Sequence, residues 1–229
     1  MQAKDVMTTE VVVAAEDTPI HEVVGKLITH RISGMPVVDA LGRVVGIVSE
    51  GDLLQPEGRP SASRAWWLEA VYAGDTIQFK RAHGRTAGAI MTKDVVTVGP
   101  DTPLAEIARL IERKRIKRVP VVTTEGELVG IVSRANLLHG LADAIVRSHE
   151  PDREKDRALR ADVLNALKHV PSLDPVLINV TVADGEARLW GQVETQAEIA
   201  AAEKAVAGLD GVKSVVNNLG LQPASGVPV

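Results

Sequence analysis

The sequence predicts an α+β protein: two β-α-β-β-α repeats packed as a pseudo-symmetric pair, followed by a small α-β-β-α-β domain. Residues 6–54 and 90–138 match each other without a gap at a constant offset of 84. In both copies, valine-rich segments alternate with apolar spacings typical of amphipathic helices. The last third starts a different pattern, in which a helical segment precedes an Asp-Gly hairpin signal.

Composition narrows the range of functions. The chain has 229 residues, of which 45% are hydrophobic and 24% charged, which is ordinary for a globular protein of one to three domains. A net charge of −4 gives no basic field for nucleic acid, so no nucleic-acid partner is predicted. The absence of cysteine excludes disulfides and Cys-ligated zinc. Residues 1–10 lack the apolar core of a signal peptide, and we expect a cytoplasmic protein.

Each repeat predicts the same succession of elements. In the first, Val11–Val13 forms a strand, and Thr18 caps a helix with Pro19 at its first position. A Pro-Val-Val strand, a turn at Leu41-Gly42 and a Val-Gly-Ile-Val strand follow, and a second helix begins near Ser49. The second repeat has its counterparts at Val95–Val98, Thr102-Pro103, Pro120-Val121-Val122, Glu125-Gly126 and Ser133. One such unit exposes an apolar sheet that a second unit can bury.

The predicted domain organisation has five parts: repeat 1 at residues 1–56, a linker at 57–86, repeat 2 at 87–148, a small domain at 153–222 and a disordered tail at 223–229. The linker contains a short Trp-rich helix with Trp66 and Trp67. These aromatics could form a lid or a dimer contact. We favour the simpler interpretation that they pack on the edge of the repeat module.

The small domain is predicted from local signals. Helices are expected at Asp156–Val170 and Thr195–Leu209. Strands are expected at Val176–Ala183, Glu186–Val193 and Gly211–Leu221, the first two joined by a tight turn at Asp184-Gly185.

Two resemblances follow from these residues. The motif Met-Thr…Asp-Thr-Pro…Pro-Val-Val…Gly-Ile-Val-Ser-x-x-(Asp/Asn)-Leu-Leu resembles the CBS domain family, whose members usually occur as tandem pairs (Bateman modules). The pattern Ile-x-Val-x-Val-x-Asp-Gly followed by Gly-Val-x-x-Val-x-Asn-x-Leu resembles the BON domain. BON domains are associated with envelope or phospholipid binding. In an acidic chain without a signal peptide we prefer a protein-interaction or oligomerisation role.

The junction of strand and helix at Ser49 and Asp52 is the main candidate site. From position alone, Asp52 would simply complement the helix dipole. The CBS resemblance implies instead that the Ser lies near phosphate and the Asp binds ribose. The second repeat has Ser133 and Asn136 there, and Asn lacks charge assistance. We therefore expect two unequal sites, with the Asp52 site tighter.

The resemblance also implies that the repeats complete each other's sites. The first site would use Ser49, Gly51, Asp52, Met91, Val95, Val96, Ile116, Lys117 and Arg118. The second would use Ser133, Ala135, Asn136, Met7, Val11, Val12, Ile32 and Ser33. Lys117 and Arg118 end the densest basic run and are expected to contact phosphates.

No catalytic pattern is present. The six histidines are scattered without HExxH spacing, and there is no Walker A or GxGxxG loop. We therefore expect no enzyme, no metal site and no required cofactor, with an adenine nucleotide (AMP, ADP or ATP) as regulatory ligand. The resemblance implies signalling through CBS-pair packing to the BON-like domain, and a homodimer formed through the CBS helices. The alternative is a structural adaptor or oligomerisation protein that does not sense nucleotides and whose BON-like domain binds a protein or phospholipid.

Overall fold

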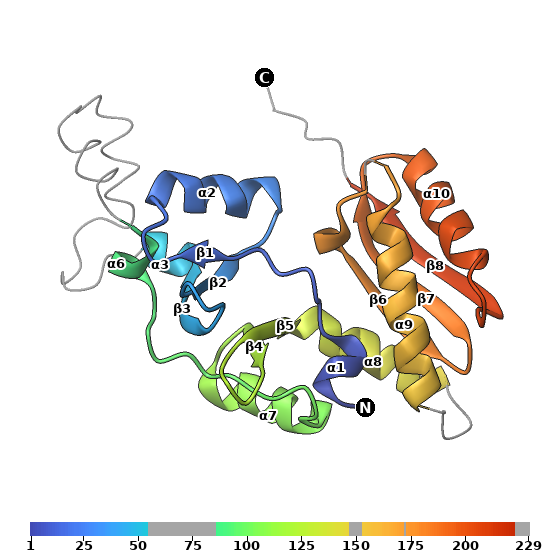
Figure 1. Cartoon of the computed structure of the whole chain (residues 1–229), viewed down its shortest axis with the longest axis horizontal. Coiled ribbons are helices and arrows are strands. Elements are labelled where there is room, and N and C mark those ends of the chain that lie inside the picture. Colours follow the sequence, from blue (N-terminus) through green and yellow to red (C-terminus); the bar gives the residue numbers. More distant parts are fainter. Residues whose placement is uncertain (55–85, 147–152, 172, 223–229) are drawn as a thin grey trace. The chain divides into compact units, whose positions relative to one another are not determined.

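A computed structural model describes residues 1–54, 86–146, 153–171 and 173–222 (Figure 1). The predicted Trp-rich helix with Trp66 and Trp67 and the predicted tail lie outside these residues. The chain divides into two compact units. Unit 1 comprises Met1–Glu10, Pro100–Val119 and Ile131–Val229, and unit 2 comprises Val11–Gly99 and Pro120–Gly130.

Unit 2 contains the body of the first repeat. Its elements are β1 (Ala14–Ala15), α2 (Ile20–Thr29), β2 (Gly34–Val38), β3 (Val44–Ser49), α3 (Glu50–Leu54) and α6 (Ala87–Ile90). The strands form a sheet of order β1-β2-β3, in which β1 runs parallel and β3 antiparallel to β2. Val23 and Leu27 of α2 pack in one buried cluster with Met35, Val37 and Val48 of the sheet, as the apolar spacing predicts.

The first strand of each repeat differs from the prediction. β1 is Ala14–Ala15 and not Val11–Val13, and in the second repeat only an isolated bridge joins Val98 to Val121. Val98 donates to the carbonyl of Pro120 (3.1 Å) and accepts from Val122 (2.9 Å). The next bond toward the N-terminus would need a donor at Pro120, which has no N–H. Proline therefore ends the parallel ladder, and valine's strand propensity does not extend it.

The start of each first helix is also shifted by one residue. Pro19 and Pro103 occupy the N-cap position of α2 and of α7 (Leu104–Lys114), and neither helix has a side-chain cap. The Thr18 hydroxyl accepts instead from the backbone N–H of Ala15 at 2.9 Å. The predicted threonine cap is wrong because this side chain closes the preceding turn.

The hairpin turns agree with the prediction. Gly42 and Gly126 have φ angles of 75° and 86°, a conformation that glycine adopts without strain. Each turn connects the two strands that were expected beside it.

Unit 1 contains the rest of the second repeat and the C-terminal domain. Its repeat elements are α1 (Ala3–Val6), α7 and α8 (Arg134–Val146). The strands β4 (Arg118–Val122) and β5 (Leu128–Ser133) form a two-stranded sheet through which the division between the units runs. Neither α1 nor its counterpart α6 was predicted from the sequence.

The C-terminal domain has the predicted α-β-β-α-β order. Its elements are α9 (Arg153–Lys168), the 3-10 turn η1 (Pro175–Leu177), β6 (Ile178–Ala183), β7 (Glu186–Val193), α10 (Gln196–Ala207) and β8 (Ser214–Leu221). The sheet order is β6-β7-β8, with β7 antiparallel to β6 and parallel to β8. Asp184 and Gly185 both have positive φ (52° and 80°), as a two-residue type I′ turn requires.

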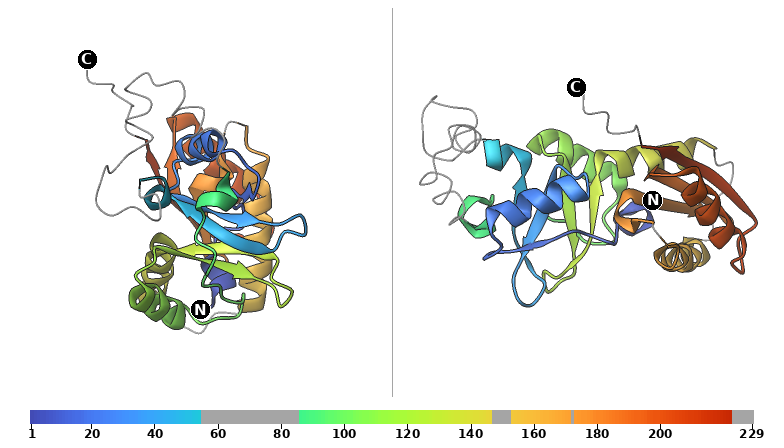
Figure 2. Two further views of the ribbon diagram at one scale, coloured as in Figure 1. Left: turned by 90° about the vertical axis from the view of Figure 1, so that its left-hand side faces the viewer. Right: turned by 90° about the horizontal axis from the view of Figure 1, so that it is seen from above.

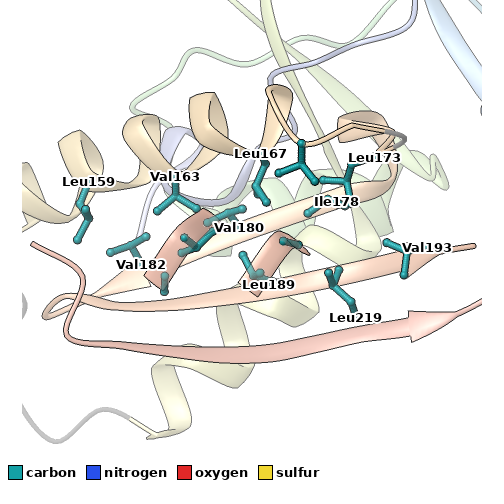
Figure 3. Packing of buried hydrophobic residues seen from close by; sticks show 14 residues of the cluster. Leu159, Val163, Leu167, Leu173, Ile178, Val180, Val182, Leu189, Val193 and Leu219 are labelled. Carbon is teal, nitrogen blue, oxygen red and sulfur yellow. The ribbon is translucent and has the colours of Figure 1, made fainter. Parts of the chain in front are cut away.

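This domain has a core of its own. The helices α9 and α10 cover one face of the sheet (Figure 2), and Leu159, Val163 and Leu167 of α9 point at Val180, Val182 and Leu189 (Figure 3). Every buried residue of this cluster lies between Leu159 and Leu219. The core therefore does not depend on side chains from the repeats.

Candidate functional site

In unit 2, Asp52 lies in the first turn of α3, which directly follows β3. Its Oδ2 accepts hydrogen bonds from the backbone N–H and the hydroxyl of Ser49, both at 2.7 Å. Its Oδ1 is 3.4 Å from the Thr92 hydroxyl, a long contact, and the side chain is half-buried. A carboxylate offers about four acceptor positions. Two are used by Ser49, so Oδ1 keeps capacity to accept from a ligand.

Thr92 is held beside Asp52 by backbone bonding. Ile47 and Thr92 exchange two hydrogen bonds of 3.0 Å each. The preceding Met91 is buried against Gly46, where a β-carbon would overlap the methionine side chain. Because residue 46 of β3 is glycine, the segment after α6 can pack closely against β3 beside the Asp52 turn.

The two predicted base-contacting valines, Val95 and Val96, follow this segment and are half-buried. Because the ladder ends at Val98, Val96 lies outside the sheet. No described residue donates a hydrogen bond to the Val96 carbonyl. The segment thus presents a backbone acceptor in the same unit as Asp52.

The second turn, in unit 1, has the same geometry with a different side chain. Asn136 Oδ1 accepts from the N–H and hydroxyl of Ser133 at 2.7 and 2.6 Å. Its Nδ2 donates to the Val6 carbonyl at 3.0 Å and to the Thr8 hydroxyl at 3.3 Å. An asparagine side chain can make four hydrogen bonds, and Asn136 makes four while being only 3% exposed. It has no capacity left for a ligand in this arrangement.

Thr8 takes the place in this turn that Thr92 takes beside Asp52. It exchanges hydrogen bonds of 3.0 and 2.9 Å with Ile131. The role of these two threonines was not predicted, although the recurrence of Met-Thr at the 84-residue offset was a signal for it.

The remaining predicted site residues fall on both sides of the division. Ile116, Lys117 and Arg118 belong to unit 1, whereas Asp52 belongs to unit 2. Val11, Val12, Ile32 and Ser33 belong to unit 2, whereas Asn136, Ser133, Ala135 and Met7 belong to unit 1. Lys117 is exposed after the left-handed C-cap Arg115 of α7, and Arg118 begins β4. Gly51 lies beside the Ser49 hydroxyl. The joint action of residues from different units stays a prediction.

The described part of the chain offers neither a metal site nor a helix that could span a membrane. It contains no group of three or more His, Cys, Asp or Glu side chains able to hold a metal ion. Among its helices, none combines the length and apolar character that crossing a bilayer requires.

The duplicated turns and the separate C-terminal core define a tandem CBS domain pair followed by a BON domain. The CBS domain family matches residues 3–56 and 87–143, and the BON domain family matches residues 155–223. The chain therefore belongs to the CBS domain family and ends in a BON domain.

Individual relatives support this assignment. The chain is 32% identical over 154 residues to the uncharacterized protein MJ1426 of Methanocaldococcus jannaschii, a match covering 62% of this chain and 91% of that protein. It is 30% identical over 129 residues to the chloroplastic CBS domain-containing protein CBSX1 of Arabidopsis thaliana, covering 53% of this chain but only 55% of that protein. Among solved structures, it is similar to the CBS-pair protein CBSX2 in complex with AMP. The TM-score is 0.50 and the identity 25%, over 63% of this chain and 98% of that one.

Proposed function

We propose that this protein is a regulatory module that binds an adenine nucleotide between its CBS repeats and passes the resulting change in packing to its BON domain. The observation that carries the proposal is the Asp52 carboxylate, whose Oδ2 is fixed by Ser49 and whose Oδ1 is left as an acceptor. A fixed carboxylate at a turn suits the vicinal hydroxyls of a ribose, which are donors. The AMP complex of the similar CBSX2 structure supports this choice of ligand.

Preference for adenine would come from the backbone. The 6-amino group of adenine donates hydrogen bonds, and the Val96 carbonyl is an acceptor without a described donor. The 6-oxo group of hypoxanthine or guanine cannot donate to it. Val95, Met91 and Ile116 would provide apolar contact to the base, and Gly51, Lys117 and Arg118 would face the phosphates.

The nucleotide-binding site beside Asp52 (the first cleft) and the one beside Asn136 (the second cleft) are proposed to differ in affinity. Asn136 uses its full hydrogen-bonding capacity inside the protein, so a nucleotide there would have to displace the bonds to Val6 and Thr8. Residues Met7, Val11, Val12, Ile32, Ser33, Ser133 and Ala135 would complete this weaker cleft. We assign the primary site to Asp52.

Calorimetric titration of the full chain with AMP tests the proposal. We expect one binding event at micromolar concentration, and in Asp52→Ala a loss of roughly 10- to 150-fold in affinity, the equivalent of one charge-assisted hydrogen bond. Asp52→Asn keeps the shape of the side chain and removes the charge, and is expected to fall between the two. No binding of AMP, ADP or ATP at millimolar concentration would refute the proposal.

In this proposal the protein has a regulatory and not a catalytic role. The proposal also includes a homodimer formed through the CBS helices. Leu138, Leu141 and Ile145 are exposed at helical spacing along α8. Sedimentation of the full chain with and without AMP measures the oligomer. A pull-down or liposome signal that requires only residues 153–222 and ignores nucleotide would favour the adaptor function instead.

A further inference from the structure

The sheet of the BON domain has a second face that α9 and α10 do not cover. Along β6 and β7, side chains alternate between the apolar core and this other face. The other face carries Asn179 and Thr181 of β6, paired in register with Trp190 and Arg188 of β7. Thr181 is 1% exposed and Asn179 7%, so in the chain this polar face is covered.

The covering element is α8 of the second CBS repeat. The His139 ring stacks on the Trp190 indole, with centroids 4.8 Å apart and planes 10° from parallel. His139 Nδ1 lies 3.2 Å from Asn179 Nδ2, and Asp143 Oδ1 lies 3.5 Å from Arg188 Nε. The spacings correspond: four residues of helix rise about 6 Å, close to the roughly 6.6 Å of two strand residues. His139 and Asp143, one turn apart on α8, can therefore contact Trp190 and Arg188, two residues apart on one face of β7.

These contacts are polar, whereas the core beneath the sheet is apolar and self-contained. Interfaces of this polar kind between domains of one chain are the ones that commonly open and close. Separation of α8 from the sheet would leave both the BON core and its secondary structure intact.

The same face is joined by hydrogen bonds through α1 to the second turn, formed by Ser133 and Asn136. The Val6 carbonyl accepts from Asn136 Nδ2 at 3.0 Å and from Asn179 Nδ2 at 3.1 Å. The adjacent Met7 carbonyl accepts from Nη2 of the buried Arg160 at 2.6 Å, and Arg160 Nε donates to Val180 at 2.7 Å. The segment Val6–Thr8 thus forms hydrogen bonds with both the BON domain and Asn136 of the second repeat.

We propose that the polar face of the BON sheet, formed by Asn179, Thr181, Arg188 and Trp190, is a releasable docking surface for α8, coupled to the second CBS cleft through Asn136, Val6 and Asn179. A nucleotide that recruits the Asn136 amide breaks its bond to Val6 and weakens docking. By reciprocity, docking lowers the affinity of that cleft. The nucleotide part of this inference rests on the proposed function, whereas the coupling between Asn136 and Trp190 does not.

The coupling is tested in the full chain without nucleotide, using the indole N–H resonance of Trp190 in ¹⁵N NMR spectra. Asn136→Ala should move this resonance and accelerate its exchange with solvent on the order of tenfold, because the cleft no longer holds α8 to Val6. Asn136→Asp keeps the shape and removes the donors, and should act in the same direction if the alanine variant folds poorly. Asp52→Ala, at the equivalent turn of the other repeat, is the matched control and should leave the resonance in place.

An unmoved Trp190 resonance in both folded Asn136 variants would overturn the coupling, whatever the protein binds. The second arm adds AMP to His139→Ala, which removes the stack on Trp190. A second binding event, absent from the wild type, is expected. If the wild type binds AMP at the Asp52 cleft and His139→Ala binds it identically, the coupling is wrong while the proposed function stands.

Discussion

Asn136 and Asn179 donate hydrogen bonds to one acceptor, the carbonyl oxygen of Val6, at 3.0 and 3.1 Å. Asn136 belongs to the second CBS repeat and Asn179 to the BON domain. The Val6 carbonyl of the N-terminal segment is therefore shared by the second CBS repeat and the BON domain. A carbonyl oxygen has two lone pairs, so both bonds can be made together.

Replacement of Asn136 by Asp tests the value of this connection. The substitution keeps the acceptor for Ser133 but places a carboxylate oxygen against the Val6 carbonyl in a buried position. Loss of the donors and burial of the charge should lower the free energy of unfolding by about 1–3 kcal/mol. Urea unfolding measures the change. Asp52→Asn, the reverse exchange at a half-buried turn, should change it by less than about 1 kcal/mol; equal effects would contradict the assignment of a structural role to Asn136.

Ligand chemistry tests the ribose contact independently of mutations. If Oδ1 of Asp52 accepts from a ribose hydroxyl, 2′-deoxy-AMP should bind roughly tenfold or more weakly than AMP to the wild type. In Asp52→Ala the two ligands should bind alike, because the acceptor is gone. Competition titrations of both ligands against both proteins give the comparison. If 2′-deoxy-AMP still bound as much more weakly than AMP in Asp52→Ala as in the wild type, the ribose would not contact Asp52.

Gly191 provides a test that the BON domain is a separate folding unit. Its φ of 142° is a conformation that other residues rarely adopt, and a β-carbon there would overlap the Leu177 carbonyl. Gly191→Ala should therefore destabilise the BON domain by about 1–3 kcal/mol. Hydrogen exchange followed by mass spectrometry should show faster exchange in β6–β8 and unchanged exchange in β2 and β3. Equal acceleration in both would mean that the domains unfold together.

The sequence predicted features whose causes are local. Asp184-Gly185 identifies its turn because two consecutive positive φ angles favour that pair. Ser49 and Asp52 could be predicted as a unit because both lie within one turn, although the hydrogen bonds between them were not expected.

Features that depend on distant partners escaped prediction. The donors of Asn136 are used by Val6 and Thr8, about 130 residues away, so the sequence suggested a weakened ligand contact where the structure has a saturated side chain. The contact of His139 with Trp190 likewise joins two domains. The strand predicted at Val11–Val13 was wrong for a different reason. The proline in the neighbouring strand has no backbone N–H to donate to the parallel ladder, and this outweighs the strand propensity of three valines.

Docking of α8 should be sensitive to acid because of His139. Nδ1 of this ring faces the Nδ2 donor of Asn179, so it acts as an acceptor and the ring is neutral. Burial lowers the pKa of His139 below 6.5. A base whose pKa is lowered on docking stabilises the docked form above pH 6.5, and this contribution is lost as the pH falls through 6.5 and past the lowered value.

Burial is the cause of the lowered pKa of His139. On the same sheet face, Arg188 of β7 is paired with Asp143 of α8, so these two charges offset each other beside the ring. The Asp5 carboxyl accepts a hydrogen bond from Arg157 at 2.6 Å, and its pKa is lowered. Burial by itself would raise the pKa of Asp5, but hydrogen bonds from Arg157 and the Gln2 backbone hold it below 3.8. The Asp5–Arg157 contact of α1 with α9 therefore persists between pH 7.5 and 5.

A pH titration of the Trp190 indole resonance from 7.5 to 5 should follow this loss of docking, with His139→Gln as the control. Glutamine cannot take up a proton in this range, so the variant should show a flat profile, although its docking is weaker throughout. A transition of the same size in His139→Gln would assign the acid sensitivity to another histidine. A flat profile in the wild type would mean that protonated His139 is tolerated against Asn179, and the ring would then not hold α8 as an acceptor.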